Sequence, residues 1–372
     1  MRPRLKPRHA ASLLAMGLCA AAQAQSSVNV SGYLSLGVFK KTGGPTQVST
    51  IERSSLTFSG SEDLGDGLSA TFRLSHRFDM DTGTVEASDT VRPFWKGEST
   101  VGLKGAFGAL RIGRALTPLW AQTWNPDPWY GFNRIASQQW WLLAPDYLSD
   151  PLNGQGAGGG LGGDYARINN GIFYDSPTFN GFHTHIAVAV DKRPGVDLGR
   201  NAGGILKYDQ GPLDLFVGAE QNSQKDKVYY LGGAYQIDKL GLGAWYSHVK
   251  LNPSGAVYGP AWTNWAGASN PTTKRTAAAI NASYAIGSGT VRAGWGKDFQ
   301  GSTSFFNYVG STFSNAGTGY SGPATMLSAG YLYTLSKRTS VYADVARVKW
   351  TFVDDNGRTA VTGVDVGITH SF

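Results

Sequence analysis

Apolar and polar residues alternate with a period of two along most of this chain, which predicts β-strands rather than helices. The pattern is clear near both ends. Residues 27–38 place apolar side chains at every second position, and residues 364–372 do so up to a terminal phenylalanine. Segments of about ten residues with the same pattern recur between these two ends. Each predicted strand therefore has one apolar face and one polar or small-residue face.

Compact turn signals separate pairs of these segments, and longer polar or aromatic stretches separate one pair from the next. The seven expected turns cover residues 62–67, 105–108, 176–181, 209–212, 238–241, 287–289 and 336–339. The eight longer connections cover residues 40–50, 79–96, 116–165, 191–201, 221–227, 250–273, 299–323 and 352–358. An all-β antiparallel arrangement of about sixteen strands follows. An even number of strands with short turns on one side is typical of transmembrane β-barrels.

Closure of the sheet follows from the chemistry of the backbone. No stretch after residue 25 supplies the ~20 consecutive apolar residues of a membrane-spanning helix. Strands that face hydrocarbon must pair all their N–H and C=O groups, so the first and last strands are expected to meet. Residues 25–372 would then form one barrel, and sixteen strands are enough to leave a water-filled channel.

The first 24 residues have the organisation of a cleaved signal peptide. Four bases precede an apolar run over residues 10–22, and Ala22-Gln23-Ala24 matches a cleavage signal. The only cysteine, Cys19, lies in this leader, so no disulfide is expected in the mature protein. The formal net charge of +7 becomes +3 without the leader, because 29 bases then face 26 acids. The high isoelectric point therefore says little about partners.

Several turn and strand-end motifs resemble the general porins of beta-proteobacteria. They are SEDLGDGLSATF (61–72), STVGLKGAFG (99–108), GR (113–114), NNGIFYDSP (169–177), LSKRT (335–339) and HSF (370–372). The resemblance implies an outer-membrane homotrimer of sixteen-strand barrels in contact with lipid. It also implies that the third extracellular loop, here 116–165, folds into the lumen and sets the constriction. In that family the final strand, here ending in Phe372, is the signal for the outer-membrane assembly machinery.

The resemblance does not transfer the constriction residues directly. The family pattern has arginines where this chain has Ser55 and near Gly97, and a carboxylate where it has Ser75. Strand parity, the alternation of inward and outward side chains along each strand, supplies another prediction. It points seven bases into the channel: Arg53, Arg73, Arg77, Arg111, Arg167, Lys207 and Arg292. Any one of them can be a solvated side chain without a role, but several together would concentrate small anions.

The third loop supplies the other candidates for the constriction. Its charged candidates are Asp127, Arg134, Asp146 and Asp150, and its aromatic candidates are Trp129 and Trp140. The loop is rich in aromatic residues overall, which favours packing of the rings against the barrel wall. The alternative is a stacking track for sugars or aromatic solutes.

The predicted function is passive diffusion of small hydrophilic solutes and ions through a weakly anion-selective channel. A substrate-specific channel for sugars or organic acids is the main alternative, and an outer-membrane barrel enzyme is less favoured. No catalytic residue, cofactor, metal site or nucleic-acid partner is expected. His183 and His185 share a strand face, yet no third ligand lies near them in the sequence. A GxGxxG match at 154–159 lies in a glycine-rich loop and lacks the strand and helix of a nucleotide site.

Overall fold

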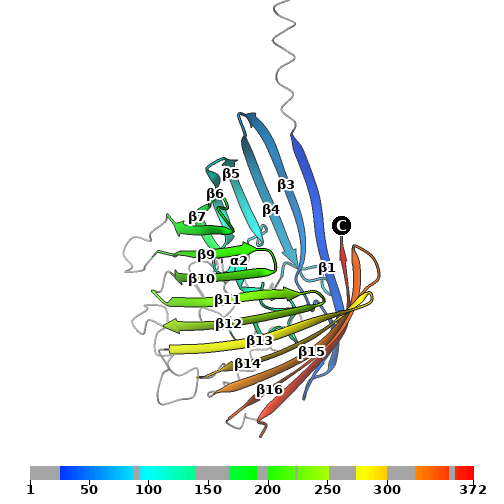
Figure 1. Ribbon diagram of the computed structural model, residues 1–372. Helices are drawn as coiled ribbons and strands as arrows, with labels where there is room; N and C mark the ends of the chain where they lie inside the picture. Colours follow the sequence, from blue (N-terminus) through cyan, green and yellow to red (C-terminus); the bar gives the residue numbers. More distant parts are fainter. Residues whose placement is uncertain are drawn as a thin grey trace, which may run out of the picture.

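The computed structural model of this chain describes residues 26–86, 93–131, 133–139, 142, 167–190, 200–222, 225–250, 274–299, 323–351 and 357–372. Their strands form one antiparallel sheet that closes on itself (Figure 1). The strands are β1 Ser27–Lys41, β2 Thr46–Ser49, β3 Ser54–Gly65, β4 Leu68–Phe78, β5 Glu98–Gly105, β6 Gly108–Leu116, β7 Arg167–Asp175, β8 Phe182–Ala189, β9 Ala202–Gln210, β10 Leu213–Gln221, β11 Lys227–Ile237, β12 Leu240–Lys250, β13 Lys274–Ile286, β14 Gly289–Asp298, β15 Ala324–Thr334, β16 Thr339–Trp350 and β17 Ala360–Ser371. A short helix, α2 (Trp120–Thr123), follows β6.

The seventeen strand segments occupy sixteen positions around the barrel. β3 pairs with residues 27–33 of β1, while the short β2 pairs with residues 37–40 of the same strand. β2 and β3 therefore lie end to end beside β1, as two parts of one interrupted strand. The prediction of an all-β barrel with about sixteen strands is confirmed.

The barrel closes where the C-terminal strand meets the first strand. β17 runs antiparallel to β1 from Tyr33↔Ser371 to Lys41↔Gly363, and Figure 1 shows the C-terminus beside β1. Gly32 and Phe372 exchange two backbone hydrogen bonds, of 3.0 and 3.1 Å. A β-carbon at Gly32 would overlap the ring of Phe372, so glycine leaves room for the last residue at the seam.

Side-chain burial is inverted relative to a water-soluble protein. Large apolar side chains are exposed on the outer surface, among them Val101, Ile112 and Leu206. Residues on the opposite face of the sheet, including Arg292 and Asp344, are buried on the inner side. This is the distribution expected for strands whose outer face contacts lipid. Among the described residues, no helix is long and apolar enough to cross a membrane.

The strand connections follow the predicted asymmetry. All seven short turns fall inside or directly beside the predicted turn regions, and the long connections lie at the opposite strand ends. The expected leader, residues 1–24, lies outside the described residues. So do Asp146, Asp150 and Trp140 of the third loop, and their predicted roles remain predictions.

Candidate functional site

The described part of the third loop, residues 117–131, 133–139 and 142, contacts the inner face of strands on two sides of the barrel. The Leu119 amide donates to Glu220 Oε1 on β10 at 2.6 Å. The Asn281 side chain on β13 donates to the Pro126 carbonyl at 2.9 Å. Trp129 Nε1 donates to Asp344 Oδ1 on β16 at 2.8 Å. The loop thus runs along the inner wall from β10 to β16.

An apolar cluster fixes the start of this loop against the wall. Leu119 and Trp120 are buried with Phe216, Tyr230 and Trp245, which come from β10, β11 and β12. The three wall rings form a stack, with centroid separations of 5.2 and 5.8 Å and interplanar angles of 14° and 17°. Burial of such rings supplies much of the free energy that holds a loop in place.

The loop aromatics within the described residues divide into two groups. Trp120 and Trp129 are buried, and Trp124 packs against the apolar cluster while partly exposed. Tyr130 is exposed and has a positive φ of 51°. These positions fit the packing interpretation better than a stacking track. Phe132, Trp140, Trp141 and Tyr147 lie outside the described residues.

Glycines on the inner wall allow the loop to approach the strands closely. A β-carbon at Gly243 on β12 would overlap the carbonyl of Pro126, and one at Gly294 on β14 would overlap the side chain of Gln138. The Pro126 contact involves backbone atoms, which cannot rotate away as a side chain can. The loop tip can therefore hold this position only because Gly243 has no side chain.

We expect Gly243→Val to push the loop tip away from β12 and to lower the single-channel conductance. Overpacking of this kind costs about 1–3 kcal/mol. Gly241→Val is the matched control, since a β-carbon there meets only the side chains of Ser283 and Gln236. Single-channel recordings in planar bilayers compare the two variants. Equal conductance for wild type, Gly243→Val and Gly241→Val would contradict this role of the glycine.

A buried polar centre holds the middle of the loop. Arg292 Nη2 lies 2.9 and 3.0 Å from the two carboxylate oxygens of Asp344. The same carboxylate accepts hydrogen bonds from Trp129 Nε1 and, at 3.0 Å, from Asn133. The Arg292 guanidinium also lies 5.3 Å from the centroid of the Trp129 ring. Arg292 is only 4% exposed, so this inward base holds the loop rather than facing open water.

Asp127 serves the internal structure of the loop. Its carboxylate accepts hydrogen bonds from the Trp129 amide at 2.9 Å, from the Gly131 amide at 3.3 Å, and from the Ser137 hydroxyl. Burial raises its pKa to about 6, against the opposing effect of these hydrogen bonds. The side chain is 1% exposed. Asp127 therefore stabilises the loop by hydrogen bonds to other residues of the same loop.

Arg134 connects the third loop to the second. Its guanidinium lies 3.0 Å from Glu86 and donates to the Thr50 carbonyl at 3.3 Å. Lys96 and Arg53 lie 3.2 and 3.6 Å from the same Glu86 carboxylate. Burial alone would raise the pKa of Glu86, but the surrounding positive charges hold it well below its usual range. Glu86 is therefore a charged centre around which both loops are ordered.

A row of ionisable side chains crosses five neighbouring strands on the inner face, from Arg73 on β4 to His185 on β8. Glu98 lies 3.2 Å from Arg73 and 2.9 Å from Arg111. Asp175 lies 3.1 Å from Arg111 and 2.7 Å from His185. Arg73 is 51% exposed at its side chain and Arg111 is 29% exposed. These two guanidiniums are therefore accessible to water on the inner wall.

Arg167 stands where the family pattern would have a base near Gly97. It is buried, and its Nε donates to the Gly97 carbonyl at 2.8 Å. Arg77 is paired in register with Ser55, the other position where the pattern has an arginine. The Arg167 guanidinium thus reaches Gly97 from β7, and Arg77 lies opposite Ser55 across the β3–β4 pair.

The inner wall has an uneven distribution of charge. Strands β3–β7 and the loops beside them place eight bases on this side, namely Arg53, Arg73, Arg77, Lys96, Arg111, Arg114, Arg134 and Arg167. Within the described residues these bases form ion pairs with Asp79, Glu86, Glu98 and Asp175. On β9 and β10, one base lies between two acids, since Lys207 lies 2.8 Å from Asp214 and 3.5 Å from Asp209. Lys207 also donates to Gln122 of the third loop at 3.1 Å.

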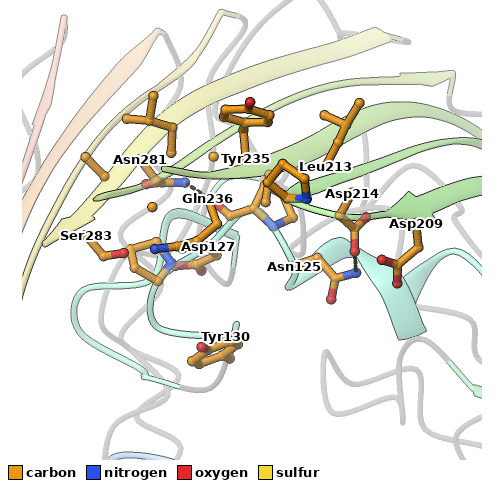
Figure 2. A pocket seen from close by; sticks show the side chains of 18 of the residues that line it. Asn125, Asp127, Tyr130, Asp209, Leu213, Asp214, Tyr235, Gln236, Asn281 and Ser283 are labelled. Carbon is orange, nitrogen blue, oxygen red and sulfur yellow. Dashed lines mark hydrogen bonds between the residues drawn. The ribbon is translucent and has the colours of Figure 1, made fainter. Parts of the chain in front are cut away.

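A cavity of about 250 Å³ separates the loop tip from the short-turn ends of the strands. Figure 2 shows Asp209 and Asp214 at one end of it, Asn281 and Ser283 at the other, and Tyr130 across from both. Asn125 of the loop donates to Asp214 at 2.9 Å. The loop therefore touches the wall at separate points and leaves open space between them.

Some charged residues of the inner wall and their contacts were not among the sequence predictions. Arg114 was missed because a bulge between Gly113 and Ala115, with Gly113 at a φ of +129°, reverses the strand parity. Glu98 and Asp344 follow the normal alternation, so parity could have found them. The long-range pairs of Arg134 had no local signal.

Comparison with known proteins matches this architecture to a family. The family model described as Gram-negative porin matches residues 10–351. The chain belongs to the Gram-negative porin family. Outer membrane porin protein 32 of Delftia acidovorans is 29% identical to this porin, over 97% of this chain and 99% of the relative. An outer membrane porin protein of Bordetella pertussis is 28% identical over 98% of both chains.

Solved structures give the same result. The structure titled as an anion-selective porin from Comamonas acidovorans matches with a TM-score of 0.70 and 25% identity, over 94% of this chain and 100% of that one. The trimer form of OmpT from Vibrio cholerae matches with a TM-score of 0.63 at 14% identity, over 93% and 99%, which shows the fold alone. This porin is an outer-membrane β-barrel, as the sequence predicts.

Proposed function

We propose that this porin is a passive, weakly anion-selective channel for small hydrophilic solutes and ions. The observation that carries the proposal is the row from Arg73 to His185, in which two guanidiniums are exposed on the inner wall. Guanidinium groups remain charged at every physiological pH. The relative titled as anion-selective supports the same sign of selectivity.

The selectivity should be moderate because each exposed base has an acidic partner. Glu98 lies between Arg73 and Arg111, and Asp175 neutralises part of the Arg111 charge. The buried bases Arg53, Arg167 and Arg292 act on permeating ions through the loop and the wall rather than by contact. Positive potential in a narrow water-filled channel raises the local concentration of anions.

Solute flux distinguishes this proposal from a substrate-specific channel. Liposomes that contain the porin are placed in solutions of sugars and organic acids of increasing size, and swelling rates are recorded. A general diffusion channel gives rates that fall smoothly with solute size and rise linearly with concentration. Saturation by one solute, at a concentration where others of equal size do not saturate, would favour the specific channel.

We also propose that residues 1–24 are removed as a signal peptide and that the mature chain forms a homotrimer. OmpT of Vibrio cholerae has a structure in trimer form, and closed rings of identical subunits are a common form of homo-oligomer. Unheated detergent gels should show a band near three times the monomer mass that collapses on boiling. A monomer by light scattering in mild detergent would count against the trimer.

The C-terminal Phe372 provides a test of assembly. We propose that it is read by the outer-membrane assembly machinery while its backbone closes the barrel against Gly32. Deletion of Phe372 should lower the amount of folded porin in the membrane and leave the conductance of assembled channels unchanged. Normal surface levels of the deletion variant would show that the residue is dispensable.

A further inference from the structure

Two histidines on the inner wall have ring nitrogens that the channel function does not use. His183 and His185 lie two residues apart on β8, between the exposed outer-face residues Phe182 and Ile186. Their ring centroids are 5.1 Å apart and the rings are nearly perpendicular. His183 Nδ1 and His185 Nε2 are shielded from solvent and have no hydrogen-bond partner among the described residues.

The separation of the rings suits a shared metal ion. Imidazole nitrogens bind zinc at roughly 2.0–2.1 Å, and two imidazoles at a tetrahedral angle then have centroids roughly 5 Å apart. We propose that His183 and His185 form a binding site for a divalent transition-metal ion, such as Cu²⁺ or Zn²⁺. The site goes beyond the channel function and does not depend on its ion selectivity.

Asp175 on β7 contacts His185, and the sequence alone could not show this contact. It is paired in register with His185, and its carboxylate lies 2.7 Å from His185 Nδ1. A carboxylate that accepts a hydrogen bond from one imidazole N–H fixes the ring and leaves the other nitrogen as the metal ligand. Here that other nitrogen is Nε2, which is also the one without a hydrogen-bond partner in the described part of the chain.

The charges around the pair permit a cation. Lys207 is in register with His183 on β9, but its ammonium lies close to Asp214 and Asp209. Arg111 is likewise paired with Glu98 and Asp175. The described residues contain no group of three or more metal-ligating side chains. The ion would therefore keep water in its remaining positions and bind reversibly, at a pair in which the His185 side chain is 23% exposed.

Ligand chemistry sets the expected order of metals. Imidazole prefers Cu²⁺ over Zn²⁺, while Mg²⁺ prefers oxygen ligands and should not bind. The mature porin also contains His76, His248 and His370. His248 lies on β12 and is hydrogen-bonded to Thr276, so His248→Gln is a matched control on another strand.

Titration calorimetry on the mature porin in detergent, purified without a histidine tag, tests the proposal with Zn²⁺ and Mg²⁺. We expect one Zn²⁺ per chain, loss of this binding in His183→Gln and in His185→Gln, and about tenfold weaker binding in Asp175→Asn. His248→Gln should bind as wild type. Absence of Zn²⁺ binding by wild type, or unchanged binding in both pair variants, would overturn the proposal.

A second test records the electron paramagnetic resonance spectrum of Cu²⁺ bound to the wild-type porin. This test needs no variant, so it does not depend on whether the variants fold. Two imidazole nitrogens in the spectrum are expected at one Cu²⁺ per chain. A spectrum with oxygen ligands only, or with one nitrogen, would overturn the shared site.

Discussion

Replacement of Arg73 and Arg111 together by glutamine should shift the reversal potential in a potassium chloride gradient strongly toward the cation side. These two guanidiniums are exposed on the inner wall, and both pair with Glu98. Their loss leaves Glu98 without these two partners and Asp175 without Arg111. A unit charge about 8 Å from a permeating ion in water changes its energy by about 0.5 kcal/mol. Two such charges should therefore lower the anion-to-cation permeability ratio by about fivefold.

The control for this variant is Lys225→Gln, which removes a base from the long connection between β10 and β11. Lys225 lies outside the strands, and charges beyond ~8 Å are screened at physiological salt, so this control should leave the reversal potential almost unchanged. If the double variant behaves like the control, the exposed arginines do not set the selectivity.

Removal of the negative charge at Asp344 should release the third loop. Asp344 is the common partner of Arg292, Trp129 and Asn133. Asp344→Asn keeps the size of the side chain but leaves the buried Arg292 charge without its carboxylate, and a broken buried pair costs about 3–5 kcal/mol. We expect a lower thermal stability and an unsteady conductance with frequent transitions, since the middle of the loop loses its main anchor.

Asp365→Asn is the matched control on the neighbouring strand β17. Its carboxylate also lies buried on the inner face, but its contact with the loop is a longer hydrogen bond of 3.3 Å from Asn133. Its replacement should have a much smaller effect on melting temperature and on channel noise. Equal effects of the two substitutions would indicate that the Asp344 contacts do not specifically hold the loop.

The barrel could be predicted from the sequence because its determinants are local. Alternation, turn residues and connection length together indicated the strand count and the seven turns. One local irregularity was missed, since β2 and β3 together fill a single strand position. A short break around residues 50–53 has no clear signature in the alternation.

The site was less predictable because its contacts join residues far apart in the sequence. Parity identified Arg73 and Arg111, but it could not show that Glu98 lies between them. Strand parity predicted that Arg292 and Lys207 point into the channel in the same way as Arg73 and Arg111. Both Arg292 and Lys207 are instead buried against the third loop. Only the three-dimensional packing of the loop separates exposed bases from anchoring ones.

The sign of the wild-type reversal potential tests the central claim most directly. The porin is inserted in a planar bilayer between two potassium chloride solutions of different concentration, and the zero-current potential is measured at low and at molar salt. The exposed guanidiniums of Arg73 and Arg111 on the inner wall predict preference for chloride. This preference shrinks at molar salt because the Debye length falls to about 3 Å. Preference for potassium at low salt would contradict the account.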